Sequence, residues 1–270
     1  MVKIGWNSNS FTSHSLEDVI PWLGELGYQA IAITPDVPHL DPRYSGPDMV
    51  RRVGNLCSQH GLEVVVETGA RFLLNPKLKH RPNLLEPDAS RDIRLKFLRH
   101  MVEWCDLLGA KVLSFWSGVV PDQQDSPLER LGDGVAKLAR HAERYGVRLA
   151  LEPEPGHYIS TLADYRLFVE AFPGLVHLCL DTGHLLANQE VAPHLALAEW
   201  KDEIINIQLD DARAGVHEHL PPGEGEIDWK KWWEAVATIN LDVPACWELS
   251  RDSHRFAKLV QSAQLVNSSR

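Results

Sequence analysis

The sequence predicts one α/β domain, a single (β/α)8 TIM barrel that spans residues 1–270. Three observations favour this fold. A short apolar segment followed by an amphipathic segment recurs eight times, and no linker or shift in composition interrupts the repeat. The turn after the first apolar segment reads NSNSF, without the glycines typical of an open doubly wound sheet. The length of 270 residues allows one large α/β barrel, although it would also fit two small domains.

The first half of the chain supplies four strand and helix units. A strand at 3–7 precedes a helix that begins near Ser15, whose spacing to Asp18 resembles a capping box, and that stops at Gly27. The next strands are expected at 29–34, 62–67 and 111–116, and their helices at 47–61, 90–108 and 127–145. The segment 69–87 is long for a loop in a compact domain, which is typical of a binding segment or lid.

The second half is organised around VRLALEPEPGH, residues 147–157. Its apolar run predicts a buried strand that ends at Glu152, because Pro-Glu-Pro-Gly cannot continue a helix or a central strand. The other strands are expected at 177–181, 204–209 and 244–249. Helices are expected at 162–172, 192–199, 229–239 and 254–266, and a second long loop at 210–228.

Composition limits the classes of partner. The net charge of −10 and the pI near 5.7 oppose a nucleic-acid ligand. No apolar run reaches the ~18 residues of a membrane helix, and the opening MVKIGWNSNS does not resemble a signal peptide. We therefore expect a soluble cytoplasmic protein without a membrane or nucleic-acid partner. The four cysteines are widely spaced, which predicts reduced, buried thiols.

In a (β/α)8 barrel the chemistry lies at the carboxyl ends of the strands. The side chains expected there are Asn7, Thr34, Glu67, Trp116, Glu152, Asp181, Gln208 and Glu248. Strands five to eight thus bring three carboxylates and one amide to the same half of the mouth. Such a cluster would repel itself unless a divalent cation lay within it, and oxygen ligands suit Mg²⁺ or Mn²⁺. Taken alone, Glu152 could equally cap the next helix.

Histidines and cations lie in the segments that follow these strands. His184 comes three residues after Asp181, and His219 belongs to a His-x-His pair before PPGEG, whose glycines would let the backbone fold over a ligand. A solvated surface loop is the alternative for that pair. The loop after strand three carries Arg71, Lys77, Lys79, His80 and Arg81, which fit either a clamp for a substrate phosphate or carboxylate or a solvated charge run.

The ordered motifs LALEPEPG, LDTGH, IQLDD, HLPPGEGEIDW and CWEL resemble the xylose isomerase-like superfamily, over essentially the whole chain. Within it they look like the sugar phosphate isomerase/epimerase group, which is related to apurinic-site endonuclease family 2. The resemblance implies one divalent metal ion, Mn²⁺ or Mg²⁺, with Co²⁺ or Zn²⁺ as alternatives. Its implied ligands are Glu152, Asp181, Gln208 and Glu248, and its implied substrate contacts are His184, His219 and, with approximate spacing, Arg213.

The sequence differs from the family pattern in two ways, which favour the sugar isomerase/epimerase group over the apurinic-site endonucleases. Gln208 stands where the family commonly has histidine; an amide oxygen can bind a hard cation but is a poor zinc ligand. The related endonucleases hold three zinc ions with extra histidines at the ends of strands three and four. Those positions here are Glu67 and Trp116, so the cluster could not be completed and DNA repair is not expected.

The expected reaction is proton transfer next to a carbonyl. We expect an isomerase or epimerase that acts on a ketose or related sugar, phosphorylated or not, through an enediolate, with Glu152 and Glu248 as acid and base. Glu67, Trp116 and His157 are expected to contact the sugar. The alternatives are a metal-dependent dehydratase of a cyclic polyol ketone, of the inosose or dehydroshikimate type, and a non-catalytic barrel-fold binding module. The sequence is compatible with a homo-oligomer and does not determine the oligomeric state.

Overall fold

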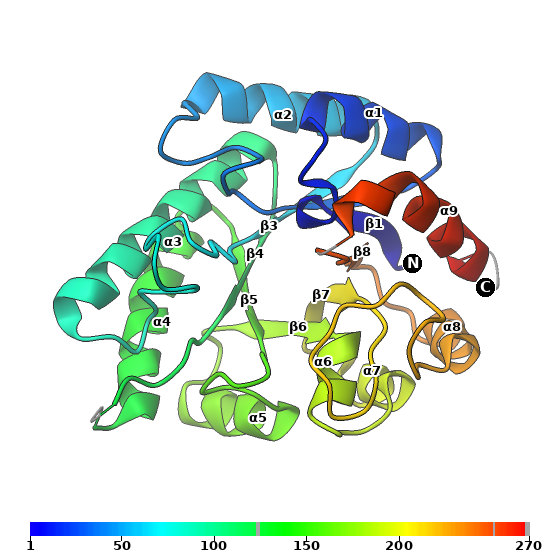
Figure 1. Cartoon of the computed structure of the whole chain (residues 1–270). Coiled ribbons are helices and arrows are strands. Elements are labelled where there is room, and N and C mark those ends of the chain that lie inside the picture. The colour runs from blue at the N-terminus through cyan, green and yellow to red at the C-terminus, as the bar shows by residue number, and fades with distance from the viewer. Residues whose placement is uncertain (123–124, 251, 268–270) are drawn as a thin grey trace.

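The computed structural model describes residues 1–122, 125–250 and 252–267. Eight parallel strands pair in chain order, and β8 closes on β1, which confirms the (β/α)8 barrel. In Figure 1 the helices surround this barrel. The strands are β1 (Lys3–Asn7), β2 (Ala30–Ile33), β3 (Glu63–Glu67), β4 (Val112–Trp116), β5 (Arg148–Glu152), β6 (His177–Asp181), β7 (Ile204–Leu209) and β8 (Pro244–Trp247).

Every expected helix forms, with ends shifted by a few residues. Ser15 caps the first one, because its Oγ accepts a hydrogen bond from the Asp18 amide at 3.1 Å. The helices are α1 (Leu16–Glu25), α2 (Pro47–Gln59), α3 (Asp88–Leu108), α4 (Pro127–Glu143), α5 (Leu162–Ala171), α7 (Pro193–Trp200), α8 (Trp229–Thr238) and α9 (Phe256–Asn267), with the 3₁₀ turn η2 (Ser253–Arg255) before α9.

Two short helices at the mouth were not expected. The 3₁₀ turn η1 (Ser8–Phe11) follows β1, and α6 (Thr182–Ala187) follows β6. Asp181 caps α6, since its Oδ1 accepts a hydrogen bond from the His184 amide at 2.9 Å. Both helices are too short for a hydrophobic period to reveal them.

The expected end of the last strand, at residue 249, was wrong. β8 ends at Trp247, so Glu248 is the first residue beyond the strand. The Glu248 amide still donates to the Leu209 carbonyl at 2.8 Å, but the Leu249 amide turns to the Ser10 hydroxyl oxygen at 2.8 Å. The backbone therefore leaves the sheet at Glu248 and places its side chain at the mouth.

The core has two parts. Small and β-branched side chains fill the barrel interior, and a larger apolar layer separates the strands from the helices. All four cysteines are buried and free of disulfides, which confirms the expected structural thiols. Among the described residues no helix is long and apolar enough to cross a membrane.

Candidate active site

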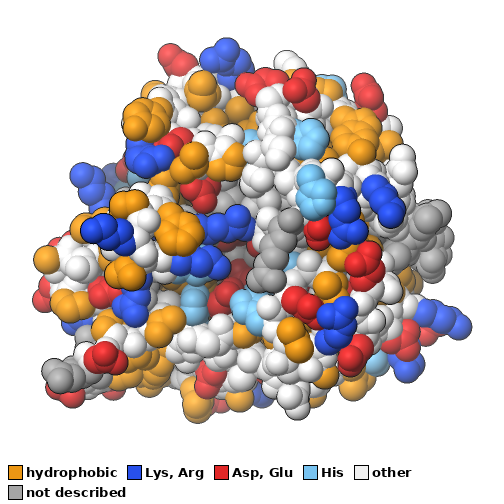
Figure 2. Space-filling model, viewed as in Figure 1, with side chains coloured by type: hydrophobic (Ala, Val, Ile, Leu, Met, Phe, Trp, Pro, Cys, Tyr) orange, Lys and Arg blue, Asp and Glu red, His pale blue; other side chains and the backbone are white. Residues whose placement is uncertain are grey.

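A cavity of about 260 Å³ opens at the mouth formed by the carboxyl ends of the strands. Figure 2 shows this face, where Lys or Arg side chains lie beside a central hollow with His side chains close by. The structure brings most of the predicted residues to the cavity. Those that line it are Glu67, Trp116, Glu152, His184, Gln208, His219 and Glu248.

Three predicted residues do not line the cavity. Asp181 is buried at the end of β6, where it caps α6. His157 packs edge-on against Trp116, with ring centroids 4.9 Å apart. The Arg213 guanidinium pairs with Glu218 at 2.9 Å and is half exposed. A direct substrate contact at His157 or Arg213 stays a prediction that this geometry does not favour.

Glu152 is a buried carboxylate that lines the cavity. Its Oε2 accepts a hydrogen bond from Gln208 Nε2 at 3.0 Å, and its Oε1 lies 3.5 Å from His184 Nδ1. Burial raises the pKa of Glu152 well above its ordinary value, and the nearby Glu154 and Asp181 carboxylates add to the shift. An ionised Glu152 therefore needs a neighbouring positive charge.

His184 presents one ring nitrogen to this acidic group. Its Nδ1 lies 3.0 Å from the Pro153 carbonyl, so Nδ1 carries the proton and donates it. Burial, with repulsion from His219, lowers the pKa of His184 to about 3, and the ring is neutral. The Nε2 lone pair thus faces Asp181 Oδ2 at 3.8 Å and Glu154 Oε2 at 3.7 Å.

His219 carries a positive charge at the opposite edge of this group. Burial alone would lower the pKa of His219, but Asp210 lies 2.6 Å from its Nδ1 and raises that pKa to about 10. Asp210 is held in turn by the Gly183 amide, which donates to its Oδ1 at 2.8 Å. Asp210 was not among the residues expected at the site, although it stands within the IQLDD motif.

The loop that carries His219 is ordered by Asp211. One carboxylate oxygen of Asp211 accepts from the Ala212 and Ile227 amides, both at 3.0 Å. The other accepts from the Gly223 amide at 2.8 Å and from Trp229 Nε1 at 3.0 Å. These four bonds explain why the motif HLPPGEGEIDW follows IQLDD so closely: its backbone wraps around one buried carboxylate.

Two further carboxylates face the cavity from the β1 to β3 side and from β8. Glu248 Oε1 accepts from Asn9 Nδ2 at 2.7 Å, and Asn9 belongs to the unexpected turn η1. Glu67 Oε2 accepts from Thr34 Oγ1 at 2.7 Å. Burial, followed by repulsion from Glu248, raises the pKa of Glu67 to about 7.

Trp116 forms an apolar wall that is backed by a buried cation. The Arg94 guanidinium lies 4.2 Å from the centre of the Trp116 ring and donates to the Thr68 carbonyl at 2.8 Å. On the cavity side, the His80 ring lies 4.9 Å from the same indole. Burial lowers the pKa of His80 to about 3, so this wall is neutral at its surface.

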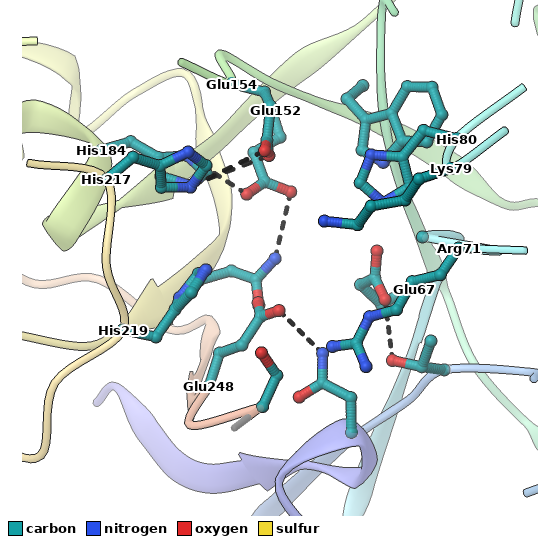
Figure 3. Close-up of a pocket in the computed structure, with 16 residues that line it drawn as sticks. Glu67, Arg71, Lys79, His80, Glu152, Glu154, His184, His217, His219 and Glu248 are labelled. Atoms are coloured by element: carbon teal, nitrogen blue, oxygen red, sulfur yellow. Dashed lines mark hydrogen bonds and ion pairs between the residues drawn. The ribbon is translucent and has the colours of Figure 1, made fainter. Parts of the chain in front are cut away.

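The side chains around Glu152 fit a divalent cation. Ligand atoms of Glu152, Glu154 and His184 lie within 4.8 Å of one another. The group His184, His217 and His219 has the same spacing, but a protonated His219 has no lone pair to offer an ion. Within the part of the chain that the structure describes, Asp181 Oδ2 and His184 Nε2 are buried without a hydrogen-bond partner. Buried carboxylates and an unpaired imidazole nitrogen are the donors that such an ion would satisfy (Figure 3).

Gln208 turns its nitrogen, not its oxygen, toward this group. Its Oε1 accepts from Asn7 Nδ2 at 3.2 Å, while its Nε2 donates to Glu152. In this arrangement Gln208 orients Glu152, and ligation of a metal by Gln208 would require the amide to turn over. The four-residue ligand set expected from the sequence stays a prediction.

Comparisons with known proteins identify the family and the relatives that this chain resembles. Residues 20–268 match the family model described as the xylose isomerase-like TIM barrel. An inosose dehydratase of Lacticaseibacillus casei is 30% identical over 140 residues, 45% of this chain and 47% of that protein, so the match spans about half of the relative's length. An L-ribulose-5-phosphate 3-epimerase, UlaE, of Shigella flexneri serotype 5b (strain 8401) is 24% identical over 193 residues, 65% of this chain and 63% of that protein.

A solved structure has the same fold as this chain. The apo crystal structure of 3-keto-D-glucoside 4-epimerase, YcjR, from E. coli has a TM-score of 0.77 and covers 99% of this chain and 100% of that one, at 18% identity. The family model covers nearly the whole length, which confirms the resemblance seen in the motifs. The chain belongs to the xylose isomerase-like TIM barrel family.

Proposed function

We propose that this chain is a divalent-metal-dependent isomerase or epimerase of a ketose or related sugar, working by proton transfer through an enediolate. One observation carries the proposal. Glu152 at the end of β5 and Glu248 just after β8 line the same cavity, and Glu152 belongs with Glu154 and His184 to a group of side chains that could bind a metal ion. The epimerase and dehydratase relatives support the same class of chemistry next to a carbonyl.

Glu152 and Glu248, which line the cavity, would hold the cation together with Asp181, whose buried Oδ2 has no hydrogen-bond partner and lies 3.8 Å from His184 Nε2. Gln208 is a further candidate. When bound, the ion would polarise a substrate carbonyl and stabilise negative charge that develops beside it. His184 is suited to this environment because its other nitrogen donates to a backbone carbonyl, which fixes the ring.

The proton transfer itself falls to the two glutamates. Gln208 donates a hydrogen bond to Glu152 Oε2, and Asn9 donates one to Glu248 Oε1, so each carboxylate is oriented by a neighbouring amide. One glutamate removes a proton from carbon and the other returns one. Return to the opposite face of the same carbon gives epimerisation, and return to the neighbouring carbon gives isomerisation. Trp116 would exclude water from one side of the sugar.

A dehydratase is the second candidate, and His219 favours it. A carboxylate would remove a proton from carbon while the protonated imidazole of His219 gives a proton to the departing hydroxyl, which leaves as water. The neighbouring Asp210 keeps that imidazole protonated near neutral pH. The inosose dehydratase relative supports this reading.

One experiment separates the two reactions. The protein is incubated in D₂O with Mg²⁺, which is diamagnetic, and a panel of ketoses, ketose phosphates and inososes, and proton NMR follows exchange at the carbon next to the carbonyl. We expect exchange with formation of an epimer or isomer. A new ultraviolet absorbance of an unsaturated ketone would instead support the dehydratase. Absence of exchange and of new absorbance with every substrate would contradict both.

A further inference from the structure

Two cations reach the cavity from the β3–α3 loop. Arg71 and Lys79 both line it, and Figure 3 shows their side chains extending into the pocket from the side opposite His184 and His219. The loop therefore gives the cavity a positive wall. The groups proposed to hold the cation and move the proton come instead from β5 to the end of β8.

The backbone of the loop is arranged to present these two side chains. The residues next to them, Ala70 and His80, both adopt left-handed conformations, with φ of 46° and 61°. Such conformations are unfavourable for residues other than glycine and persist where the surroundings enforce them, often at functional sites. The His80 amide also donates to the Arg71 carbonyl at 2.7 Å, which ties the two ends of the presenting segment together.

A neutral sugar gives this wall little to bind. Hydroxyl groups can be recognised by neutral donors and acceptors, whereas Arg and Lys are suited to phosphate and carboxylate. The chain has a net charge of −10 and the cavity holds several carboxylates, so an anionic ligand would be repelled without a local positive group.

We propose that the substrate carries an anionic group, a phosphate or a carboxylate, which Arg71 and Lys79 bind at the side of the cavity formed by the β3–α3 loop. The inference rests on the proposed function and narrows its substrate to acidic sugars. The carbonyl end of such a sugar would lie by the β5 to β8 carboxylates, and its acidic end would lie beneath the β3–α3 loop.

The test compares three substrates and three variants with Mg²⁺ present. The substrates are a ketopentose 5-phosphate, a ketouronate and the neutral ketopentose. The variants are Arg71→Gln, Lys79→Gln and the control Lys77→Gln, which removes the same charge from an exposed site of the same loop that does not line the cavity. The readouts are KM and kcat for each pair.

For wild type we expect a higher kcat/KM with the phosphate or the ketouronate than with the neutral sugar, and the better of the two identifies the anion. Arg71→Gln should lower kcat/KM for that anion by about ten- to a hundredfold, mainly through KM, and Lys79→Gln should act in the same direction. Lys77→Gln should change little. Equal losses on anionic and neutral substrates, or a preference of wild type for the neutral sugar, would overturn the proposal.

A binding measurement keeps the test independent of turnover. Inorganic phosphate is titrated into each protein by calorimetry. Binding by wild type and Lys77→Gln, with loss in Arg71→Gln, would support the anion site even if no sugar is turned over, in which case only the proposed reaction fails. Absence of phosphate binding in wild type, or equal binding in all variants, would overturn the anion site whether or not the protein is an epimerase.

Discussion

The two halves of the barrel mouth are built differently. On the β5 to β8 half, Glu152 and Asp181 are the last residues of their strands, and hydrogen bonds from the framework fix them. On the other half, Arg71 and Lys79 stand on a long loop whose backbone is held in unusual conformations. The acidic half suits chemistry that needs fixed geometry, and the cationic half suits recognition.

This contrast assigns different effects to mutations on the two sides. A change in the acidic half should alter kcat or metal affinity. A change in the cationic half should alter the preference among substrates. We make four predictions, from the largest expected effect to the smallest. Three concern the acidic half and its supports, and one concerns Glu67 at the end of β3 on the other half.

Removal of a proposed acid or base should have the largest effect. Glu152→Gln keeps the size of the side chain but cannot accept a proton from carbon, so we expect kcat to fall about 10²- to 10⁴-fold. Steady-state kinetics on the best substrate measures it. The matched control is Glu224→Gln, an exposed glutamate of the β7–α8 loop. Equal kcat values for Glu152→Gln and wild type would remove Glu152 from the reaction.

Gln208 should act on metal affinity. Gln208→Ala deletes the donor to Glu152 and the link to Asn7, so the carboxylate loses its fixed orientation. We expect Mn²⁺ affinity to fall about 10- to 100-fold, by calorimetry. The exposed Gln59→Ala on α2 is the control. Unchanged affinity would show that Glu152 needs no such support.

The raised pKa of buried carboxylates predicts how stability depends on pH. The pKa of Glu67 is raised from 4.5 to about 7, so the folded state binds more protons than the unfolded state in that window. The free energy of unfolding of the metal-free protein should therefore fall as pH rises from about 5 to 8, by on the order of 3 kcal/mol from Glu67. Urea titrations at each pH measure it.

Two comparisons sharpen the pH prediction. Glu67→Gln should flatten the slope, because the titrating carboxylate is gone. Added Mn²⁺ should restore stability most at high pH, where the carboxylates near Glu152 are ionised and attract the cation. Stability of the metal-free protein that rises from pH 5 to 8 would contradict the raised pKa of these buried carboxylates.

Asp211 should affect the loop that carries His217 and His219. Asp211→Asn replaces an oxygen acceptor by an amide donor at a site with four donors, so we expect a loss of about 2 kcal/mol in the free energy of unfolding. KM should rise because His219 is less well placed. The exposed Asp202→Asn, measured by the same denaturation, should stay close to wild type.

The sequence predicted the strands best, because their residue patterns are strong and local. Apolar runs that end at Pro, Gly or a carboxylate marked the strands, and barrel topology then brought Glu152, Gln208 and Glu248 to one mouth. That step needs no side-chain detail, because carboxyl ends of parallel barrel strands meet at one face. The length of the loop at 69–87 predicted a binding segment or lid, and Arg71, Lys79 and His80 from this loop line the cavity. Binding by the loop stays a prediction.

Other features depend on packing that no local pattern records. Asn9 meets Glu248 only because η1 folds back over β8, and the Asp210 pair with His219 requires the whole β7–α8 loop to close. Arg94 looks like a surface residue of an amphipathic helix, yet it is 1% exposed behind Trp116. The orientation of the Gln208 amide is set by Asn7, 201 positions away in the sequence.

Mn²⁺ binding, followed by electron paramagnetic resonance, tests the division of the mouth most directly. The account predicts one bound Mn²⁺ per chain in wild type and in Arg71→Gln, and loss of that ion in Glu152→Gln and Glu248→Gln. A wild-type protein that binds no Mn²⁺, or Mn²⁺ that stays bound in Glu152→Gln but is lost in Arg71→Gln, would contradict it.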